Sequence, residues 1–237
     1  MSTFNTSSAT AKTELRRQMI TQRASITTDQ KQQWDTLRCV DVAVVAQGIK
    51  ERNQLANYAP SPAQNCSDSD FDDCAESTLF DVVAERGPLD GLVVASYLSY
   101  GTEPGTQPIV DLMLDLGALV LAPVLTSTAG PRWAWYRGET ALTSSGIPQP
   151  VGEALPPEAL SLADLIIIPG LAGGRDGSRL GTGGGWYDRA LPHARVDALR
   201  LLLLYAAEVY DTVPTDPHDQ SVDAIITESG LIVIHRD

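Results

Sequence analysis

The densest group of residues able to do chemistry lies between residues 169 and 191, in the segment PGLAGGRDGSRLGTGGGWYDRAL. Glycines at this density let main-chain N–H groups approach an anion closely, and a helix starting just beyond would point its positive end at the same place. The pattern predicts a phosphate cradle at residues 181–185 with Arg179 as a charged clamp, and a flexible surface loop is the alternative. The predicted cradle consists of Gly181, Thr182, Gly183, Gly184 and Gly185.

Two familiar phosphate-binding loops do not match this segment. A P-loop ends in Gly-Lys-Ser/Thr, and the segment contains no lysine. The dinucleotide fingerprint G-x-G-x-x-G requires a third glycine where this chain has Trp186, and it requires a strand directly before its first glycine. The cradle is therefore of another kind.

Acidic residues near the cradle allow two interpretations each. Asp188 lies in the first turn of the helix expected after the glycines, where it either complements the helix dipole or reaches a magnesium ion that bridges phosphates. His218 and Asp219, in the segment VPTDPHDQSVDAIIT, form either a metal or acid/base pair or a turn fixed by proline. No Ser/His/Asp nucleophile pattern and no zinc-ligand spacing is present in the sequence.

Two further segments carry charges that a ligand can use. Lys12, Arg16 and Arg23 fall on one stripe of an expected N-terminal helix, beside an apolar stripe, so they either bind an anion against the core or form a solvated face. Glu103 follows a buried strand in SYGTEPGTQP, at the end of the strand where open α/β sheets bind ligands. It serves there as a ligand contact or as an acid at a helix start.

The elements that must position these residues alternate in α/β style. Helical spacing predicts helices over 11–24 and 28–50, and PIVDLMLDLG predicts a third helix ended by Gly117. The apolar runs GLVVASYL, ALVLAP, LADLIIIPG, LRLLLLYAA and VDAIITESGLIVI predict buried strands, whereas WAWYRG alternates like an exposed or edge strand. We therefore expect an α/β fold, a mostly parallel open sheet with helices on both faces, forming a single domain.

Domain boundaries follow from composition. Residues 11–237 are expected to form the domain, and residues 1–10 a disordered polar tail. Residues 57–79 are rich in Pro, Ser, Asn and Asp, and they predict an acidic, mobile insertion. The acids there lack the glycine and distal glutamate of an EF-hand loop.

Bulk properties limit the partners. The net charge of −13 disfavours nucleic acid and anionic membranes, while a basic pocket for a small anion stays possible. The longest apolar runs are too short for a membrane helix, and the three cysteines form no CxxC pair. We expect a cytoplasmic protein, with a monomer as the default.

Together these motifs resemble those of the 5-formyltetrahydrofolate cyclo-ligase family, also called 5,10-methenyltetrahydrofolate synthetases. The family signature reads P-G-[LV]-A-F-D-x-x-G-x-R-L-G-x-G-x-G-[YF]-Y-D-R, and this chain has PGLAGGRDGSRLGTGGGWYDR. The basic N-terminal helix, the E-x-x-T element and the C-terminal D-x-x-V-D-x-I-I-T element follow in the family's order. The likeness spans residues 12–227 apart from the acidic insertion.

The resemblance implies roles for these residues. Lys12, Arg16, Arg179, Trp186 and residues 181–185 would bind ATP, and Asp188 with Asp219 would bind Mg²⁺. A reduced formyl-folate would lie against Glu103, Trp186 and Tyr187, with Arg179 and Tyr187 as catalytic residues. In the family the formyl oxygen attacks the γ-phosphate of ATP, the neighbouring anilino nitrogen closes the ring, and phosphate leaves. Such chemistry needs positioning and charge neutralisation more than a protein nucleophile.

Three departures from the family pattern concern the folate side. Gly173 and Gly174 replace the usual Phe-Asp, which is expected to remove an aromatic ring from the folate side. Trp186 replaces Tyr or Phe, and Gln149 in GIPQP replaces a glutamate. These departures suggest two alternatives to an active cyclo-ligase: a non-catalytic nucleotide- or folate-binding protein, or a different ligase or phosphotransferase on the same scaffold.

Overall fold

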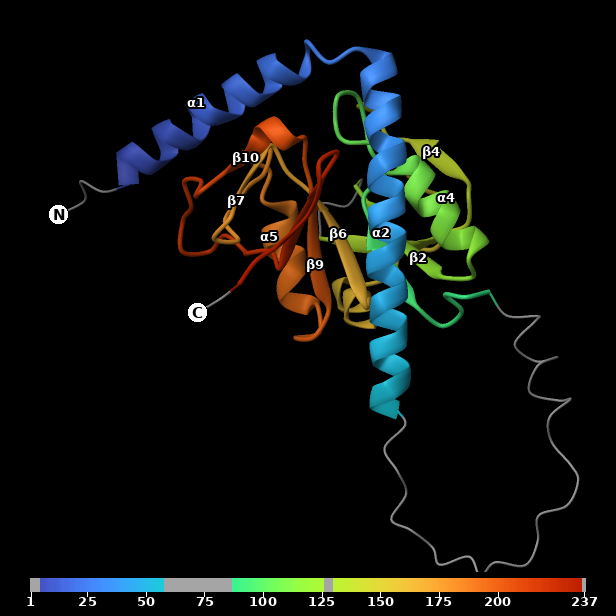
Figure 1. The fold of residues 1–237 in the computed structure, drawn as a ribbon. Coiled ribbons are helices and arrows are strands. Elements are labelled where there is room, and N and C mark those ends of the chain that lie inside the picture. Colours follow the sequence, from blue (N-terminus) through green and yellow to red (C-terminus); the bar gives the residue numbers. More distant parts are fainter. Residues whose placement is uncertain (1–4, 58–86, 126–129, 236–237) are drawn as a thin grey trace, which may run out of the picture.

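The fold is built on one seven-stranded sheet (Figure 1). The computed structural model describes residues 5–57, 87–125 and 130–235. The strand order is β12-β11-β9-β6-β1-β2-β3; the five inner strands are parallel and the two outer strands antiparallel. The strands are β1 (Val93–Ser96), β2 (Leu119–Val124), β3 (Arg132–Tyr136), β6 (Leu165–Pro169), β9 (Leu199–Leu203), β11 (Ala224–Thr227) and β12 (Gly230–Val233).

The strand order creates a switch point between β1 and β6. From β1 the chain first moves outward to β2, then returns to add β6, β9 and β11 on the other side of β1. In doubly wound sheets, loops leave the carboxyl ends of the two central strands in opposite directions and open a crevice for ligands. Here β1 leads into the loop with Glu103, and β6 leads into the glycine-rich segment.

Helices cover the sheet. On one side, α2 (Thr28–Asn57) packs against α4 (Gln107–Asp115) and the C-terminal hairpin, and α4 contacts β2. The short helix α5 (Trp186–Ala190) lies on the other side of β9 and β6 from α2 (Figure 1), beside the 3₁₀ turns η1 (Pro157–Leu162) and η2 (Leu191–His193). Buried runs such as the first four residues of β6 read as continuous apolar sequence because the sheet is covered twice. The predicted fold class is confirmed.

The first helix, α1 (Asn5–Arg23), reaches out from the top of α2 and lies beside a small second sheet (Figure 1). That sheet contains β7 (Ala172–Gly174), β8 (Arg179–Leu180) and β10 (Val209–Tyr210). Fully buried Met19 packs on Leu171, Leu180 and Val213, which form an apolar cluster separate from the main core. This cluster fixes α1 against the glycine-rich segment. The remaining elements are the hairpin β4 (Thr140–Leu142) and β5 (Pro148–Pro150) and the turn η3 (Ala206–Glu208).

Several boundaries differ from expectation. Residues 5–10 are the first turns of α1, so the predicted disordered tail at 1–10 is wrong for that part, and residues 1–4 lie outside the described residues. Likewise α2 continues to Asn57, seven residues beyond the predicted end. The expected insertion at 57–79 lies, from residue 58, outside the described residues. Strand β3 is an edge strand as predicted, but Trp133 within it is fully buried.

None of the described helices has the length and apolarity needed to cross a bilayer.

Candidate active site

A pocket of about 350 Å³ opens at the switch point of the sheet. Four segments far apart in the sequence form its wall: α1, the loop after β1, residues 169–188 and residues 216–219. Every residue predicted for the site lines this pocket. These residues are Lys12, Arg16, Glu103, Arg179, Gly181, Thr182, Gly183, Gly184, Gly185, Trp186, Tyr187, Asp188 and Asp219.

The glycine-rich turn meets the basic helix directly. The Arg16 Nε donates a hydrogen bond to the carbonyl oxygen of Gly181 at 2.9 Å. Gly183 has φ +103°, which L side chains rarely adopt, and a Cβ there would lie 3.5 Å from the guanidinium carbon of Arg16. Glycine at 183 is therefore required by the backbone conformation, whereas the space beside Arg16 would admit a Cβ in ordinary contact.

The main chain of the turn is available to a ligand. Within the described part of the chain, residues 181–185 donate no main-chain hydrogen bond. The predicted helix begins at Trp186, but it has only five residues, so its dipole is small. The capacity of this turn to bind an anion rests on its N–H groups and on the neighbouring cations.

Arg179 lies beneath this turn with 5% of its surface exposed. It forms an ion pair with Asp188, which also accepts a hydrogen bond from the main-chain N–H of Gln220 at 3.3 Å. Its Nε is buried and has no hydrogen-bond partner among the residues the structure describes. A Cβ at position 181 would lie only 3.0 Å from Arg179 Nη1, so Gly181 makes room for the clamp.

Lys12 joins α1 to the C-terminal part of the chain. Its Nζ lies 2.7 Å from Asp216 Oδ2 and 2.5 Å from Asp219 Oδ2. Burial alone would lower the pKa of Lys12, but the two carboxylates outweigh burial and raise it. The hydrogen bond from Lys12 lowers the pKa of Asp216. Burial would raise the pKa of Asp219, but Lys12 and the main-chain N–H of Asp216 together outweigh burial and lower it.

Asp216, His218 and Asp219 also form a group whose potential ligand atoms all lie within 4.8 Å of one another. The His218 Nε2 is 3.7 Å from Asp219 Oδ1, and the imidazole is exposed. The sequence predicted His218 and Asp219 as a metal or acid/base pair or as a turn fixed by proline. The structure adds that all three line the pocket.

The opposite wall is aromatic. Trp186 and Tyr187 pack tilted against each other with ring centroids 4.9 Å apart, and Trp133 packs edge-on to Trp186 at 5.1 Å. Burial raises the pKa of Tyr187, whose hydroxyl has no hydrogen-bond partner in the described part of the chain. Burial also raises the pKa of Glu103, opposed by the main-chain N–H of Tyr100.

Arg23 does not reach the pocket, although it shares the basic stripe of α1. It is 2% exposed and forms an ion pair with Glu208 at 2.6 Å. It also donates to the carbonyl oxygen of Gly170, which does line the pocket. Its role is to anchor the helix, and the stripe divides into two ligand-facing cations and one structural cation.

Comparison with known proteins agrees with this geometry. The model of the 5-formyltetrahydrofolate cyclo-ligase family matches residues 89–228. The 5-formyltetrahydrofolate cyclo-ligase of Mycolicibacterium smegmatis is 37% identical over 164 residues, covering 65% of this chain and 84% of the relative. The chain belongs to the 5-formyltetrahydrofolate cyclo-ligase family.

More distant members share the fold. The Escherichia coli K12 cyclo-ligase is 29% identical over 148 residues, covering 58% of this chain and 79% of the relative. The solution structure of the Aquifex aeolicus 5,10-methenyltetrahydrofolate synthetase superposes with a TM-score of 0.63 at 20% identity, covering 95% of this chain and 94% of that one.

Two of the departures from the cyclo-ligase pattern lie outside the pocket. Gly173 is buried in β7, and a Cβ there would meet Leu202 Cδ2 at 2.7 Å, on the core side. Gln149 accepts a hydrogen bond from the main-chain N–H of Leu125 and does not line the pocket. The expectation that glycine at 173 and 174 removes an aromatic from the folate side is therefore wrong. Trp186 is the one of the three departures that lies in the wall, and it packs on Trp133.

Sequence reasoning missed Trp133. The residue lies on the antiparallel edge strand β3 and contacts both aromatic residues of the pocket wall. Its only signal was the alternation of WAWY, which predicts an exposed or edge strand and does not reveal that Trp133 is buried.

The Lys12 contacts predict an acid-dependent change in stability. Because the pKa values of Asp216 and Asp219 are lowered in the folded protein, their contribution is present above the ordinary carboxyl pKa of 3.8 and is lost as the pH falls below it. Lys12→Met removes the cation, so urea unfolding between pH 6 and pH 3 should show a smaller acid-induced loss than in the wild type. Lys50→Met is the control, since Lys50 donates to the carbonyl oxygen of Asp90. Identical pH profiles for Lys12→Met and the wild type would contradict this account.

Proposed function

We propose that the protein catalyses the ATP- and Mg²⁺-dependent cyclisation of 5-formyltetrahydrofolate to 5,10-methenyltetrahydrofolate, releasing ADP and phosphate. The observation that carries the proposal is the junction of α1 with the glycine-rich turn, where Arg16 touches Gly181 beside Arg179 and Lys12. A polyanion bound there meets cations from both ends of the chain and free main-chain N–H groups. The family relationship supports the choice of reaction.

Phosphate binding is assigned to the cations and the turn. Lys12, Arg16 and Arg179 neutralise charge, and Arg179, with its unpartnered Nε, offers a directed donor. The amides of residues 181–185 complete the cradle. Trp186 follows directly and lines the same pocket, so we assign it to the boundary between the nucleotide and the second substrate.

The acidic residues of the pocket fit a magnesium ion. Mg²⁺ takes oxygen ligands, typically one or two carboxylates together with phosphate oxygens. Asp188 and Asp219 present carboxylates to the pocket, and Gln220, next to Asp219, bonds to Asp188. We assign the ion to this pair, with Asp216 and His218 beside them. The ion would neutralise the charge that develops on the transferred phosphoryl group.

The folate is assigned to the aromatic wall. Trp186 and Tyr187 offer ring surfaces, and Glu103 offers a carboxylate in a largely desolvated position. In the proposed reaction the formyl oxygen attacks the γ-phosphorus and ADP leaves. The neighbouring nitrogen then attacks the formyl carbon, and phosphate departs as the ring closes. In this proposal the protein positions both substrates, and we assign the buried, unpartnered hydroxyl of Tyr187 to the reacting end.

We further propose that the enzyme works as a cytoplasmic monomer. All thirteen assigned residues come from one chain, so a second copy is not needed to complete the site. Cys39 forms no disulfide within the part of the chain that the structure describes.

The direct test supplies Mg-ATP and 5-formyltetrahydrofolate and follows methenyl product by absorbance together with ADP. Equal amounts of both products are expected, and omission of either substrate should abolish both. Tight ATP binding without any methenyl product would support a non-catalytic binding protein instead. Turnover of a different acceptor only would indicate another ligase on this scaffold.

Two neighbouring arginines of α1 provide a matched test of the phosphate site. Arg16 lines the pocket, whereas Arg17 is exposed and pairs with Glu14. Arg16→Ala should weaken ATP binding at least tenfold, because a hydrogen bond from a charged group is worth about 1.5–3 kcal/mol. Arg17→Ala should leave the dissociation constant, measured by calorimetry, unchanged. Equal affinities in the two variants would show that Arg16 does not bind the nucleotide.

The metal assignment predicts a shifted magnesium titration. Asp188→Asn removes one carboxylate from the pair, so the magnesium concentration needed for half-maximal activity should rise several-fold at fixed ATP. Asp197→Asn serves as the control, since Asp197 is exposed and pairs with Arg195 away from the pocket. A magnesium titration of Asp188→Asn that overlays the wild type would remove Asp188 from the metal site.

A further inference from the structure

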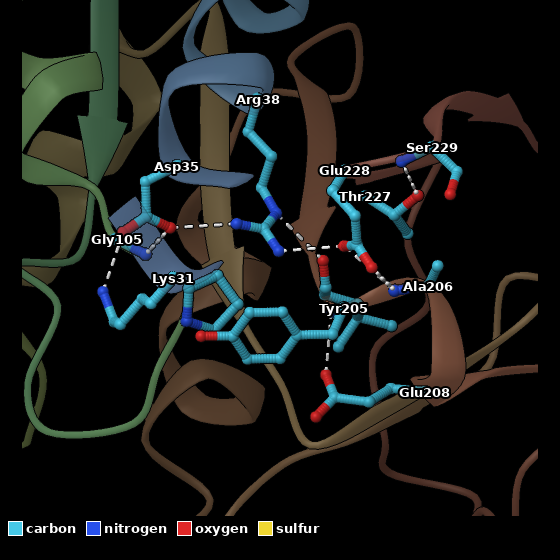
Figure 2. Close-up of polar contacts among 12 residues, drawn as sticks. Lys31, Asp35, Arg38, Gly105, Tyr205, Ala206, Glu208, Thr227, Glu228 and Ser229 are labelled. Carbon is cyan, nitrogen blue, oxygen red and sulfur yellow. Dashed lines mark hydrogen bonds and ion pairs between the residues drawn. The ribbon is translucent and has the colours of Figure 1, made fainter. Parts of the chain in front are cut away.

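The loop that carries Glu103 is held from behind by a polar network centred on α2 (Figure 2). Asp35 lies at its middle with 6% of its surface exposed. Its Oδ1 accepts the main-chain N–H of Gly105 at 2.7 Å and Arg38 Nη1 at 2.9 Å. Its Oδ2 accepts Lys31 Nζ at 2.8 Å. A carboxylate with three donors has little freedom to move, so the loop is fixed to the helix at this point.

The contact requires glycine at position 105. A Cβ built there would lie 2.1 Å from Asp35 Oδ2 and 2.5 Å from its carboxyl carbon. The loop backbone therefore lies directly against the aspartate, closer than any other residue type permits. Gly105 is two residues from Glu103, so this contact limits where Glu103 can be.

Arg38 extends the network to the sheet. It is fully buried and reaches the carbonyl oxygen of Leu204 at 3.1 Å and Glu228 Oε2 at 3.0 Å, at the ends of β9 and β11. Its guanidinium lies over the ring of Tyr205, 4.7 Å from the centroid (Figure 2). Tyr205 in turn donates to the carbonyl oxygen of Thr102, the residue before Glu103. Two arms of one network thus hold the backbone on either side of Glu103.

Within the loop, Glu103 is aligned by its own neighbours. The main-chain N–H of Tyr100 donates to Glu103 Oε2 at 2.9 Å. The hydroxyl of Tyr97 donates to the carbonyl oxygen of Pro104 at 2.8 Å. These bonds define the shape of the loop, and the α2 network defines where the loop sits relative to the pocket.

From this geometry we propose that Asp35 and Arg38 are positioning residues for the folate side of the site, acting through Gly105 and Tyr205 on Glu103. The proposal rests on the proposed function, in which Glu103 contacts the folate. Neither residue lines the pocket, so neither touches a substrate. Asp35 bonds directly to the Glu103 loop, and among the described residues neither Asp35 nor Arg38 bonds to residues 181–185. Because the Tyr205 ring also lies near Arg23, which anchors α1, the KM for ATP is measured alongside the KM for the folate.

The test compares Asp35→Ala with Asp164→Ala. Asp164 is an equally buried aspartate at the amino ends of the central strands β6 and β1, where it accepts the main-chain N–H of Val93 and pairs with Arg195. Asp35→Ala should raise the KM for 5-formyltetrahydrofolate about tenfold and change the KM for ATP less than twofold. Asp164→Ala should change neither. An unchanged folate KM in Asp35→Ala, or an equal rise in Asp164→Ala, would overturn the proposal.

Two further variants separate positioning from general destabilisation. Asp35→Asn keeps a carbonyl oxygen for the Gly105 N–H and should restore most of the folate affinity. In a Glu103→Ala background, Asp35→Ala should add almost nothing, because no side chain remains to be positioned. If the double variant instead raises the folate KM by the product of the two single-variant increases, the proposal is overturned. If Asp35→Ala does not fold, Gly105→Ala disturbs the same contact from the loop. A wild-type folate KM in Gly105→Ala would contradict the proposal.

Amide hydrogen exchange tests whether Asp35 holds the Glu103 loop in place, and this test does not depend on catalytic activity. Exchange in residues 99–106 should speed up in Asp35→Ala and stay at the wild-type rate in Asp164→Ala. Unaltered exchange in Asp35→Ala overturns the positioning role whatever the activity. Absence of methenyl product from the wild type, with faster exchange in Asp35→Ala, would instead contradict the proposed function alone.

Discussion

Ion pairs that neutralise buried cations determine how the helices of this protein are placed on its sheet. Among the residues that the structure describes, four cations have at most 6% of their surface exposed, and a buried cation is tolerated only when an acid or a set of acceptors neutralises it. Each has a carboxylate partner: Lys12 with Asp216 and Asp219, Arg23 with Glu208, Arg38 with Asp35 and Glu228, and Arg179 with Asp188. Because three of these cations lie on α1 and α2, the pairs dictate where both helices sit on the sheet.

The four pairs divide by their access to the pocket. Arg23 and Arg38 are enclosed by protein, and their partners hold backbone segments as well, so they serve the architecture. Lys12 and Arg179 line the pocket, and the side chains of their partners are 14–27% exposed. An anionic ligand can therefore compete for these two cations, whereas it cannot reach the others. Buried ion pairs thus have two uses in this protein. Those of Arg23 and Arg38 hold the helices on the sheet, and those of Lys12 and Arg179 keep cations in the wall of the pocket.

The sequence predicted the sheet and a set of residues that line one pocket, and it failed where the outcome depends on tertiary contacts. Continuous apolar runs identified the parallel strands because both faces of the sheet are covered. The motif residues converge on one pocket because they follow strand ends at the switch point. No local pattern revealed that Asp35 meets Gly105, since that contact joins residues 70 apart. The sequence also could not show that a side chain at position 173 would point into the core, because a glycine contributes nothing to a hydrophobic pattern.

The charge pairs join the two ends of the chain. Lys12 and Asp219 are 207 residues apart, and Arg38 and Glu228 are 190 apart. During synthesis on a ribosome, α1 and α2 emerge long before the carboxylates that neutralise their cations. Until those carboxylates emerge, both helices lack these ion-pair partners. Closure of such long loops is slow compared with helix formation. We therefore expect the pocket to assemble late in folding. A chain that stops before residue 216 leaves Lys12 with neither of its carboxylates.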